Sequence, residues 1–184
     1  MAKTSFDYCL GSADSNLKKA LTAALSDAGF HASGEARNVP EFLRLLRLKQ
    51  PWLAVIDTRI PPGNIKQLAS IVEEDNLSAS LFVDTGNKGL SGYMQLKWPV
   101  ESAVLAAVAE TLCHEYARKR KLHSRIEGLE NKLKERREIE KAKGIIMKKM
   151  KLDEERAYRY LQKKSMEQRI SLGEAACRII DGSS

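Results

Sequence analysis

Positive charge is concentrated in the C-terminal part of this chain and points to a binding chemistry. Residues 114–184 hold 20 Lys and Arg against 12 Asp and Glu, a net charge of +8, whereas residues 1–113 hold 11 against 12 and carry −1. A surplus confined to one segment is the electrostatic footprint of a phosphate-binding surface. A plainer interpretation is the solvated exterior of a charged coiled coil. We recognise no nucleophile–base pair, metal-ligand cluster or phosphate-binding loop, so we predict a binding protein without enzymatic activity, cofactor or metal.

The basic residues of the last segment lie on three predicted helices. The residues that share one face at helical spacing are Ile139, Ala142, Ile146 and Met150 in the first helix, Ala157, Leu161 and Ser165 in the second, and Leu172, Ala175, Ala176, Ile179 and Ile180 in the third. Asp153 is placed to cap the second helix, Ser171 and Glu174 form a capping box for the third, and Gly182 ends it. Helices this short are unstable alone, so we expect their apolar faces to pack together.

The order and spacing of these residues resemble the ANTAR domain of bacterial transcription antitermination regulators. The matching positions are Arg137, Ile139, the run from Ala142 through Lys143, Gly144, Ile145 and Ile146 to Met147, then Ala157 and Tyr158, Leu161, Ser165 and Met166, Ala175 and Ala176, and Ile179 and Ile180. This resemblance implies RNA binding. Proteins of the family hold a leader-RNA hairpin that excludes a terminator, so that the polymerase reads through.

Within this segment we predict phosphate contacts from basic side chains and stacking of an unpaired loop base on Tyr158 or Tyr160. The predicted phosphate contacts are Arg137, Lys141, Lys143, Lys148, Lys149, Arg156, Lys163 and Lys164. Lys143 and Gly144 are the favoured pair of RNA contacts. Gly inside a helix lowers helix stability by about 1 kcal/mol relative to Ala, and it suits a place where another backbone approaches closely. Close helix packing would explain Gly144 equally well, and solvated or core positions would explain the other residues.

The N-terminal segment alternates between predicted strands and helices. The apolar run from Trp52 to Ile56 is typical of a central strand in a parallel sheet that is covered on both faces. The alternation predicts a doubly wound parallel sheet with any site at the carboxyl ends of its strands. The predicted strands are 6–11, 31–33, 52–56, 81–84 and 93–96, the predicted helices are 17–28, 39–48 and 65–73, and the chain turns helical from Val100.

This segment resembles a response-regulator receiver, most specifically from Pro51 to Asn64. Asp57 matches the phosphoacceptor position and Thr85 the hydroxyl position after the fourth strand. Receivers hold Mg²⁺ with two acidic residues after the first strand, where this chain offers only Asp14. Receivers also carry a Lys directly before a Pro after the fifth strand. Here Trp98 separates Lys97 from Pro99, so either Trp98 fills the Lys position or Lys97 is shifted.

These departures predict a degenerate receiver that does not use phosphorylation. Phosphoryl transfer needs the metal and the Lys to offset charge on the phosphoryl oxygens. In addition, only residues 86–92 separate the fourth and fifth strands, where receivers have a whole helix on their output face. Asp57 would then be mainly a relic. The alternative is a weakly working site that Asp14 and Lys97 reach from shifted positions.

Apolar residues at alternating steps of three and four run through the segment between the two predicted domains. The predicted seam of a parallel dimeric coiled coil consists of Leu112, Leu122, Ile126, Leu129 and Leu133. A helix packed on its own receiver would show similar spacing, but residues 114–136 are too charged to be buried by one domain. We therefore expect a receiver-like domain over 1–113, a coiled-coil linker over 114–136 and an ANTAR domain over 137–184.

We predict an RNA-binding antitermination regulator of a two-component system that acts as a homodimer on a leader hairpin. Its control would come from a partner protein or a sensor kinase. The alternative is a DNA-binding response regulator, but the third helix has few basic residues beyond Arg178 and would read a major groove poorly. Cys9, Cys113 and Cys177 are far apart, and we see no signal peptide or membrane span. We therefore expect a cytoplasmic protein with reduced thiols.

Overall fold

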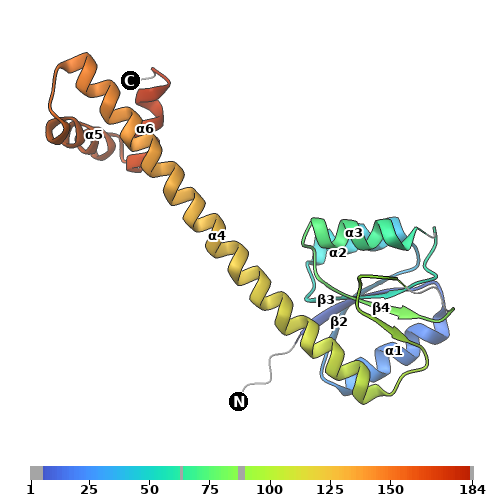
Figure 1. The fold of residues 1–184 in the computed structure, drawn as a ribbon. Helices are drawn as coiled ribbons and strands as arrows, with labels where there is room; N and C mark the ends of the chain where they lie inside the picture. Colours follow the sequence, from blue (N-terminus) through green and yellow to red (C-terminus); the bar gives the residue numbers. More distant parts are fainter. Residues whose placement is uncertain (1–5, 63, 87–89, 183–184) are drawn as a thin grey trace. The chain divides into compact units, whose positions relative to one another are not determined.

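The computed structural model describes residues 6–62, 64–86 and 90–182. The chain divides into two compact units, residues 1–120 and residues 121–184. Helix α4 (Ser102–Met150) contributes residues to both units. Figure 1 shows the elements of each unit. Among the described residues, no helix combines the length and apolarity that crossing a membrane requires.

The first unit is built on a five-stranded parallel sheet in the order β2-β1-β3-β4-β5. Its strands are β1 (Asp7–Gly11), β2 (His31–Ala36), β3 (Leu53–Asp57), β4 (Ala79–Asp84) and β5 (Gln95–Lys97), and its helices are α1 (Ser15–Asp27), α2 (Val39–Lys49), α3 (Ile65–Glu74) and the first part of α4. One core cluster joins the sheet to α1 and α4, and a second joins it to α2 and α3. The predicted doubly wound parallel sheet is confirmed.

Local residue chemistry explains where these elements begin. Every residue of β3 is buried, as its apolar run predicts for a central strand. Asp14, Asn38 and Asn64 are the N-cap residues of α1, α2 and α3, and each side chain accepts a hydrogen bond from a backbone N–H of the first turn. Edge strand β2 extends three residues beyond its predicted end because pairing with β1 continues to Ala36 across a register shift.

The connection from β4 to β5 packs two of its side chains against the sheet. The described residues between these strands, 85–86 and 90–94, contain no helix, and the predicted connection 86–92 lies partly outside the described residues. Leu90 is buried and Tyr93 packs against the α2 and α3 side of the sheet, with its ring 5.7 Å from that of Phe82. These two side chains cover the face on which a receiver has its extra helix.

The second unit contains the rest of α4 together with α5 (Glu154–Gln168) and α6 (Leu172–Ile180). The Asp153 side chain accepts a hydrogen bond from the Arg156 N–H and caps α5, while Ser171 and Glu174 form a complete capping box on α6. The three helices bury one apolar cluster, as predicted. Its buried members are Ala142, Ile146, Ala157, Leu161, Ala175, Ala176 and Ile179.

The described cysteines are all free thiols. Cys9 in β1 and Cys113 in α4 are buried, and burial raises the pKa of each thiol to about 12. A thiol with such a high pKa holds almost no nucleophilic thiolate at neutral pH. Both residues therefore act as small apolar packing groups.

Candidate functional sites

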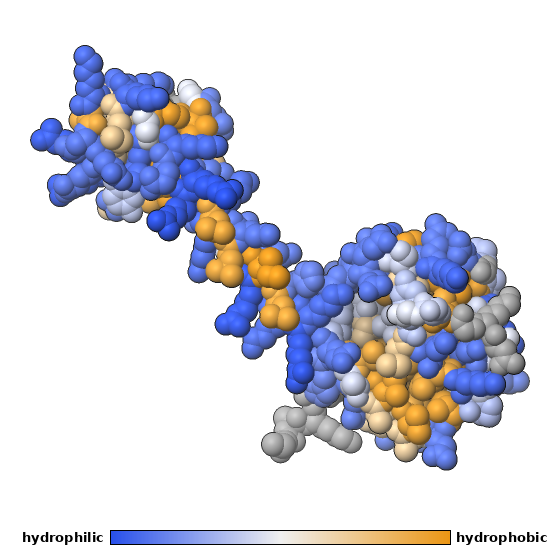
Figure 2. Space-filling model, viewed as in Figure 1, coloured by the Kyte–Doolittle hydropathy of each residue, from blue (hydrophilic) through white to orange (hydrophobic). Residues whose placement is uncertain are grey.

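Most of the side chains predicted to contact phosphate lie on the surface of α4 and α5. Arg137, Lys141, Lys148, Lys149, Arg156 and Lys163 are exposed, and Lys164 is half-buried. Figure 2 shows hydrophilic side chains covering much of the visible surface of this unit. Exposed cations on neighbouring helices can follow the phosphates of a folded nucleic acid.

Helix α5 presents a basic face that includes a residue missing from the predicted set. Arg156, Arg159 and Lys163 follow one another at steps of three and four and therefore share one side of the helix. Arg159 Nη2 lies 2.6 Å from Glu155 Oε1, and Arg156 Nε lies 3.5 Å from Asp153 Oδ2. These exposed pairs are weak, so a phosphate can replace the carboxylates. The helical spacing alone could have identified Arg159.

Lys143 is placed differently from the other predicted contacts. Its side chain is only 10% exposed, and its Nζ lies 2.7 Å from Glu154 Oε1 and 2.9 Å from Glu140 Oε1. The hydrogen bond to Glu154, followed by that to Glu140, raises the pKa of Lys143. The same contact lowers the pKa of Glu154. Because two carboxylates already satisfy this ammonium group, we assign Lys143 to the α4–α5 contact and remove it from the proposed phosphate set.

Gly144 and the two candidate tyrosines differ in their packing and exposure. A Cβ atom added at Gly144 would have no neighbour within 4 Å, so helix packing inside the chain does not require a glycine here. Tyr158 is 38% exposed and available for stacking. Tyr160 instead packs against the apolar cluster of this unit, with Lys164 Nζ 5.9 Å from the centre of its ring. Tyr158 is therefore the better placed platform for an unpaired base.

The predicted dimer seam falls into two parts. Leu122, Ile126, Leu129 and Leu133 are between 52% and 61% exposed, although they repeat at heptad spacing along α4. Apolar residues gather along this stretch of helix in Figure 2. Leu112, in contrast, packs against the core that α4 shares with α1 and the sheet. Packing on its own domain therefore explains Leu112, while the four other leucine and isoleucine positions remain open to a partner helix.

The acidic site of the first unit is centred on Asp57, which is 1% exposed at the end of β3. Ser12 Oγ, also buried, donates a hydrogen bond to Asp57 Oδ2 at 2.8 Å. The Arg59 N–H donates to Asp57 Oδ1 at 2.9 Å, and Thr85 Oγ1 lies 3.5 Å from the same oxygen. Ser12 thus occupies a position after β1 where a receiver would have an acidic residue.

Arg59 supplies the positive charge of this site. Its Nε lies 3.5 Å from Asp57 Oδ1 and its Nη2 lies 3.3 Å from Asp14 Oδ2. Asp14 is also the N-cap of α1, and hydrogen bonds from the N–H groups of Leu17 and Asn16, aided by Arg59, lower its pKa. The role of Arg59 could not be predicted from the sequence, because it depends on how the loop after β3 returns over the strand ends.

The residues present do not fit a receiver's Mg²⁺. Asp14 is engaged by two backbone N–H groups and by Arg59, and Ser12 offers a hydroxyl where a second carboxylate would bind metal. Lys97 is exposed at the end of β5, and no contact within the described residues joins it to Asp57. Trp98 packs against the core that contains α1. The weakening of the metal and Lys positions stays a prediction, which these contacts favour.

A family comparison decides the identity of the helical unit. The family model of the ANTAR domain matches residues 127–180. Residues 127–180 are an ANTAR domain. The match begins inside the segment that we predicted as linker, 114–136, and includes the last part of the apolar seam. The ANTAR domain is thus built from the C-terminal part of α4 together with α5 and α6.

Solved structures identify the fold of the unit that precedes the ANTAR domain. The signal receiver domain of the response regulator NarL from Mycobacterium tuberculosis matches 61% of this chain and 98% of its own, with 16% identity and a TM-score of 0.55. The signal receiver domain of an HD domain-containing protein from Pseudomonas fluorescens Pf-5 matches 66% of this chain and 96% of its own, with 14% identity and a TM-score of 0.58. No curated protein matches the chain in sequence.

The chain therefore joins an N-terminal domain of the receiver fold to an ANTAR domain, as predicted for an ANTAR response regulator. The ANTAR match covers most of the second unit, and the solved structures show that the first unit has the fold of signal receiver domains. The exposed basic side chains of α4 and α5 lie within the ANTAR match, and Asp57 lies at the end of β3 in the domain of the receiver fold.

Proposed function

We propose that this chain is an RNA-binding antitermination regulator, which holds a leader hairpin and thereby prevents a terminator from forming. The ANTAR match over residues 127–180 is the observation that carries this proposal. The exposed cations of α4 and α5 and the exposed ring of Tyr158 support it, because phosphates and an unpaired loop base need these two kinds of contact. The proposed contacts are Arg137, Lys141, Gly144, Lys148, Lys149, Arg156, Tyr158, Arg159, Lys163 and Lys164.

The regulator acts as a dimer in this proposal. Four large apolar side chains stay more than half exposed along α4, and a parallel partner helix would bury them as alternate positions of a heptad seam. The seam residues are Leu122, Ile126, Leu129 and Leu133. We keep residues 114–136 as the coiled-coil segment, residues 1–113 as the receiver-fold domain and residues 137–184 as the RNA-binding unit of this proposal.

Control is independent of phosphorylation in this proposal. Arg59 already pairs with both Asp57 and Asp14, and Leu90 and Tyr93 cover the face from which a receiver's responding helix would signal. A partner that recognises the receiver-fold domain by its surface, either a regulatory protein or a sensor kinase, would supply the signal. Such a partner would release or withhold the RNA-binding units.

DNA binding is the alternative, and one contact disfavours it. Arg178 is the only basic residue of α6, and its Nη1 donates to Gln168 Oε1 at 2.7 Å. A recognition helix needs side chains free to reach base edges. We expect hairpin RNAs selected from a randomised-loop library to bind the full chain at least 100-fold more tightly than duplex DNA of the same sequence. Equal affinity for both nucleic acids, or preference for the duplex, would reject the proposal.

A further inference from the structure

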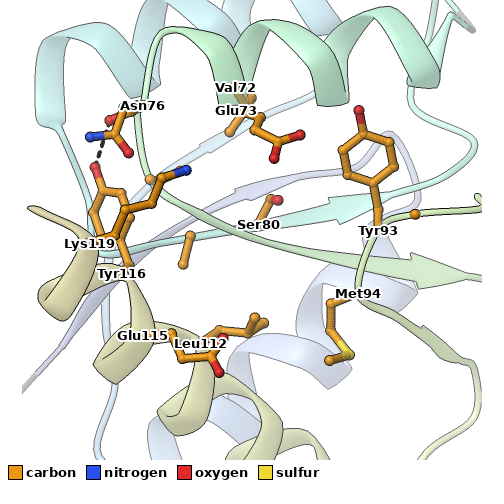
Figure 3. A pocket seen from close by; sticks show the side chains of 13 residues that line it. Val72, Glu73, Asn76, Ser80, Tyr93, Met94, Leu112, Glu115, Tyr116 and Lys119 are labelled. Carbon is orange, nitrogen blue, oxygen red and sulfur yellow. Dashed lines mark hydrogen bonds between the residues drawn. The ribbon is translucent and has the colours of Figure 1, made fainter. Parts of the chain in front are cut away.

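The exposed seam of α4 starts after the helix stops packing on the first unit. Tyr116 is the last α4 residue in the core of that unit, and its hydroxyl donates to the Asn76 carbonyl at 2.8 Å (Figure 3). From Leu122 to Leu133 the seam residues are instead more than half exposed. Steps of four, three and four join them, so the next seam position, three residues after Leu133, is Arg136. The apolar seam thus ends in a cation.

Arg136 has no counter-charge within its own chain. Its side chain is exposed, and no ion pair or hydrogen bond joins it to another described residue. Glu140 follows one turn later, but its Oε1 lies 2.9 Å from the Nζ of Lys143. Glu135 and Glu138 line a separate cavity beside α6. The carboxylates of this part of α4 are therefore engaged elsewhere and leave the charge of Arg136 open to a ligand.

A groove of about 470 Å³ runs along this end of the seam. It is lined by Leu133, Arg136, Arg137, Glu140 and Lys141, which all belong to α4 and to the second unit. Arg137 and Lys141 are exposed like Arg136, and neither makes an ion pair within the part of the chain that the structure describes. Three cations thus border the groove beside one carboxylate that is already paired, so an anion suits it better than an apolar side chain does.

A second copy of the helix would match one part of the exposed seam and not the next. In a parallel pair, the residue at position g of one helix faces the residue five places later, at position e, on the other. Arg125 and Glu130 occupy such positions and have opposite charges. One heptad later the same positions hold Lys132 and Arg137, and the Arg136 residues of the two copies face each other at the seam itself. Six cations therefore gather at this end of a dimer, which an anion between the copies would stabilise.

We propose that two copies of this chain form a phosphate-binding site between their Arg136 side chains, with Arg137 and Lys141 of each copy at its sides. A guanidinium group binds phosphate oxygens in a bidentate way, so one phosphate group can join both Arg136 residues. The backbone of a bound RNA supplies such groups. The inference rests on the proposed dimer and RNA binding, and it adds a site that is incomplete in one copy. A ligand that binds only the dimer also strengthens the dimer.

The test measures the dimer dissociation constant of the full chain by sedimentation equilibrium, first alone, then with a saturating selected hairpin RNA, and then with sodium tripolyphosphate. The hairpin should lower the constant roughly tenfold and tripolyphosphate about threefold, since the latter supplies phosphate groups without the other RNA contacts. Arg136→Gln should lower the constant of the chain alone, because the repulsion is removed, and should nearly abolish the effect of both additions. Arg136→Lys keeps the charge and should keep most of both effects.

Lys134→Gln is the matched control, because it removes one positive charge from an exposed residue of the same helix turn outside the seam. Its dissociation constants should equal those of the wild type. The proposal is overturned if neither addition strengthens the wild-type dimer, or if Arg136→Gln responds like the wild type. A response to tripolyphosphate but not to a bound hairpin supports the site and assigns it to a free anion.

Failure of this site can be distinguished from failure of the proposed function. A hairpin that binds without changing dimerisation, together with no response to tripolyphosphate, overturns the site and leaves RNA binding intact. A chain that binds no hairpin rejects the proposed function. The response to tripolyphosphate then decides the phosphate site by itself.

Discussion

The Nε of Arg59 lies 3.5 Å from Oδ1 of Asp57, so a side chain of the protein provides the positive charge next to the residue that matches a receiver's phosphoacceptor. The Arg59 backbone N–H donates to the same oxygen at 2.9 Å. Asp57 is thereby paired with a cation and hydrogen-bonded by residues of the protein itself. The receiver fold is retained while the group that would react is held in a fixed pairing.

Phosphorylation provides the first prediction. Incubation of the full chain with acetyl phosphate and Mg²⁺ should produce no stoichiometric mass gain in intact mass spectrometry, because Arg59 supplies the cation beside Asp57 and Ser12 stands where a receiver has a metal-binding carboxylate. Asp57→Asn should change read-through of a terminator less than twofold. A stoichiometric mass gain that disappears in Asp57→Asn and raises RNA affinity would contradict this account.

Dimerisation provides the second prediction. Burying one leucine is worth about 2 kcal/mol, and a dimer loses two of them in Leu129→Lys, so the dissociation constant should rise by roughly 10³. Sedimentation equilibrium measures this change. Leu48→Lys is a matched control, because Leu48 is also an exposed leucine but lies on α2 outside the seam. A monomeric wild-type chain at micromolar concentration would reject the seam.

The contact of Lys143 provides the third prediction. Lys143→Met should lower the thermal midpoint of the full chain, because Glu140 and Glu154 lose the cation between them. Lys148→Met, on an exposed turn of the same helix, should have little effect. Circular dichroism at 222 nm measures both variants. Equal midpoints for the two would show that the pairing is without consequence.

The effect of Lys143 should also depend on pH. The pKa of Glu154 is lowered in the folded chain by Lys143, so this stabilisation is present above the unfolded pKa of about 4.3 and is lost as pH falls through the folded pKa. The pKa of Lys143 is raised by Glu154 and Glu140, so its stabilisation is present below about 10.4 and is lost as pH rises through the folded pKa. The midpoint difference between wild type and Lys143→Met should therefore be largest between these limits. A difference that stays constant from pH 3 to pH 11 would contradict the assignment.

Salt dependence provides a further prediction. Lys148→Glu should weaken RNA binding and lower the slope of log affinity against log salt by about 1, since one phosphate contact is lost. Lys66→Glu makes the same charge change on α3 of the receiver-fold domain and should leave the slope unchanged. Equal effects of the two substitutions would indicate that only net charge matters.

The elements of the fold could be predicted because short-range chemistry determines them. The buried run of β3, the Asp153 cap and the capping box of Ser171 and Glu174 all depend on neighbouring residues. The sites depend on contacts between distant parts of the chain, which periodicity does not contain. Glu154 reaches Lys143 from another helix, so exposure of Lys143 could not be inferred from α4 alone.

In the receiver-fold domain, too, contacts between distant residues could not be predicted from the sequence. The missing second carboxylate near Asp14 was visible in the sequence, but the pairing of Arg59 with Asp57 and Asp14 requires the folded loop. Strand β5 is short, and its pairing with β4 starts only at Phe82. Strand length depends on the path of residues 90–94, for which local propensity gives little guidance.

Read-through of a terminator tests the central claim most directly. A selected hairpin is placed so that it overlaps a terminator, and single-round transcription is measured with and without the full chain. We predict that the wild-type chain raises read-through at least fivefold, whereas Leu129→Lys and Lys148→Glu raise it much less. Tight binding of the wild-type chain to the hairpin with no change in read-through would contradict an antitermination function.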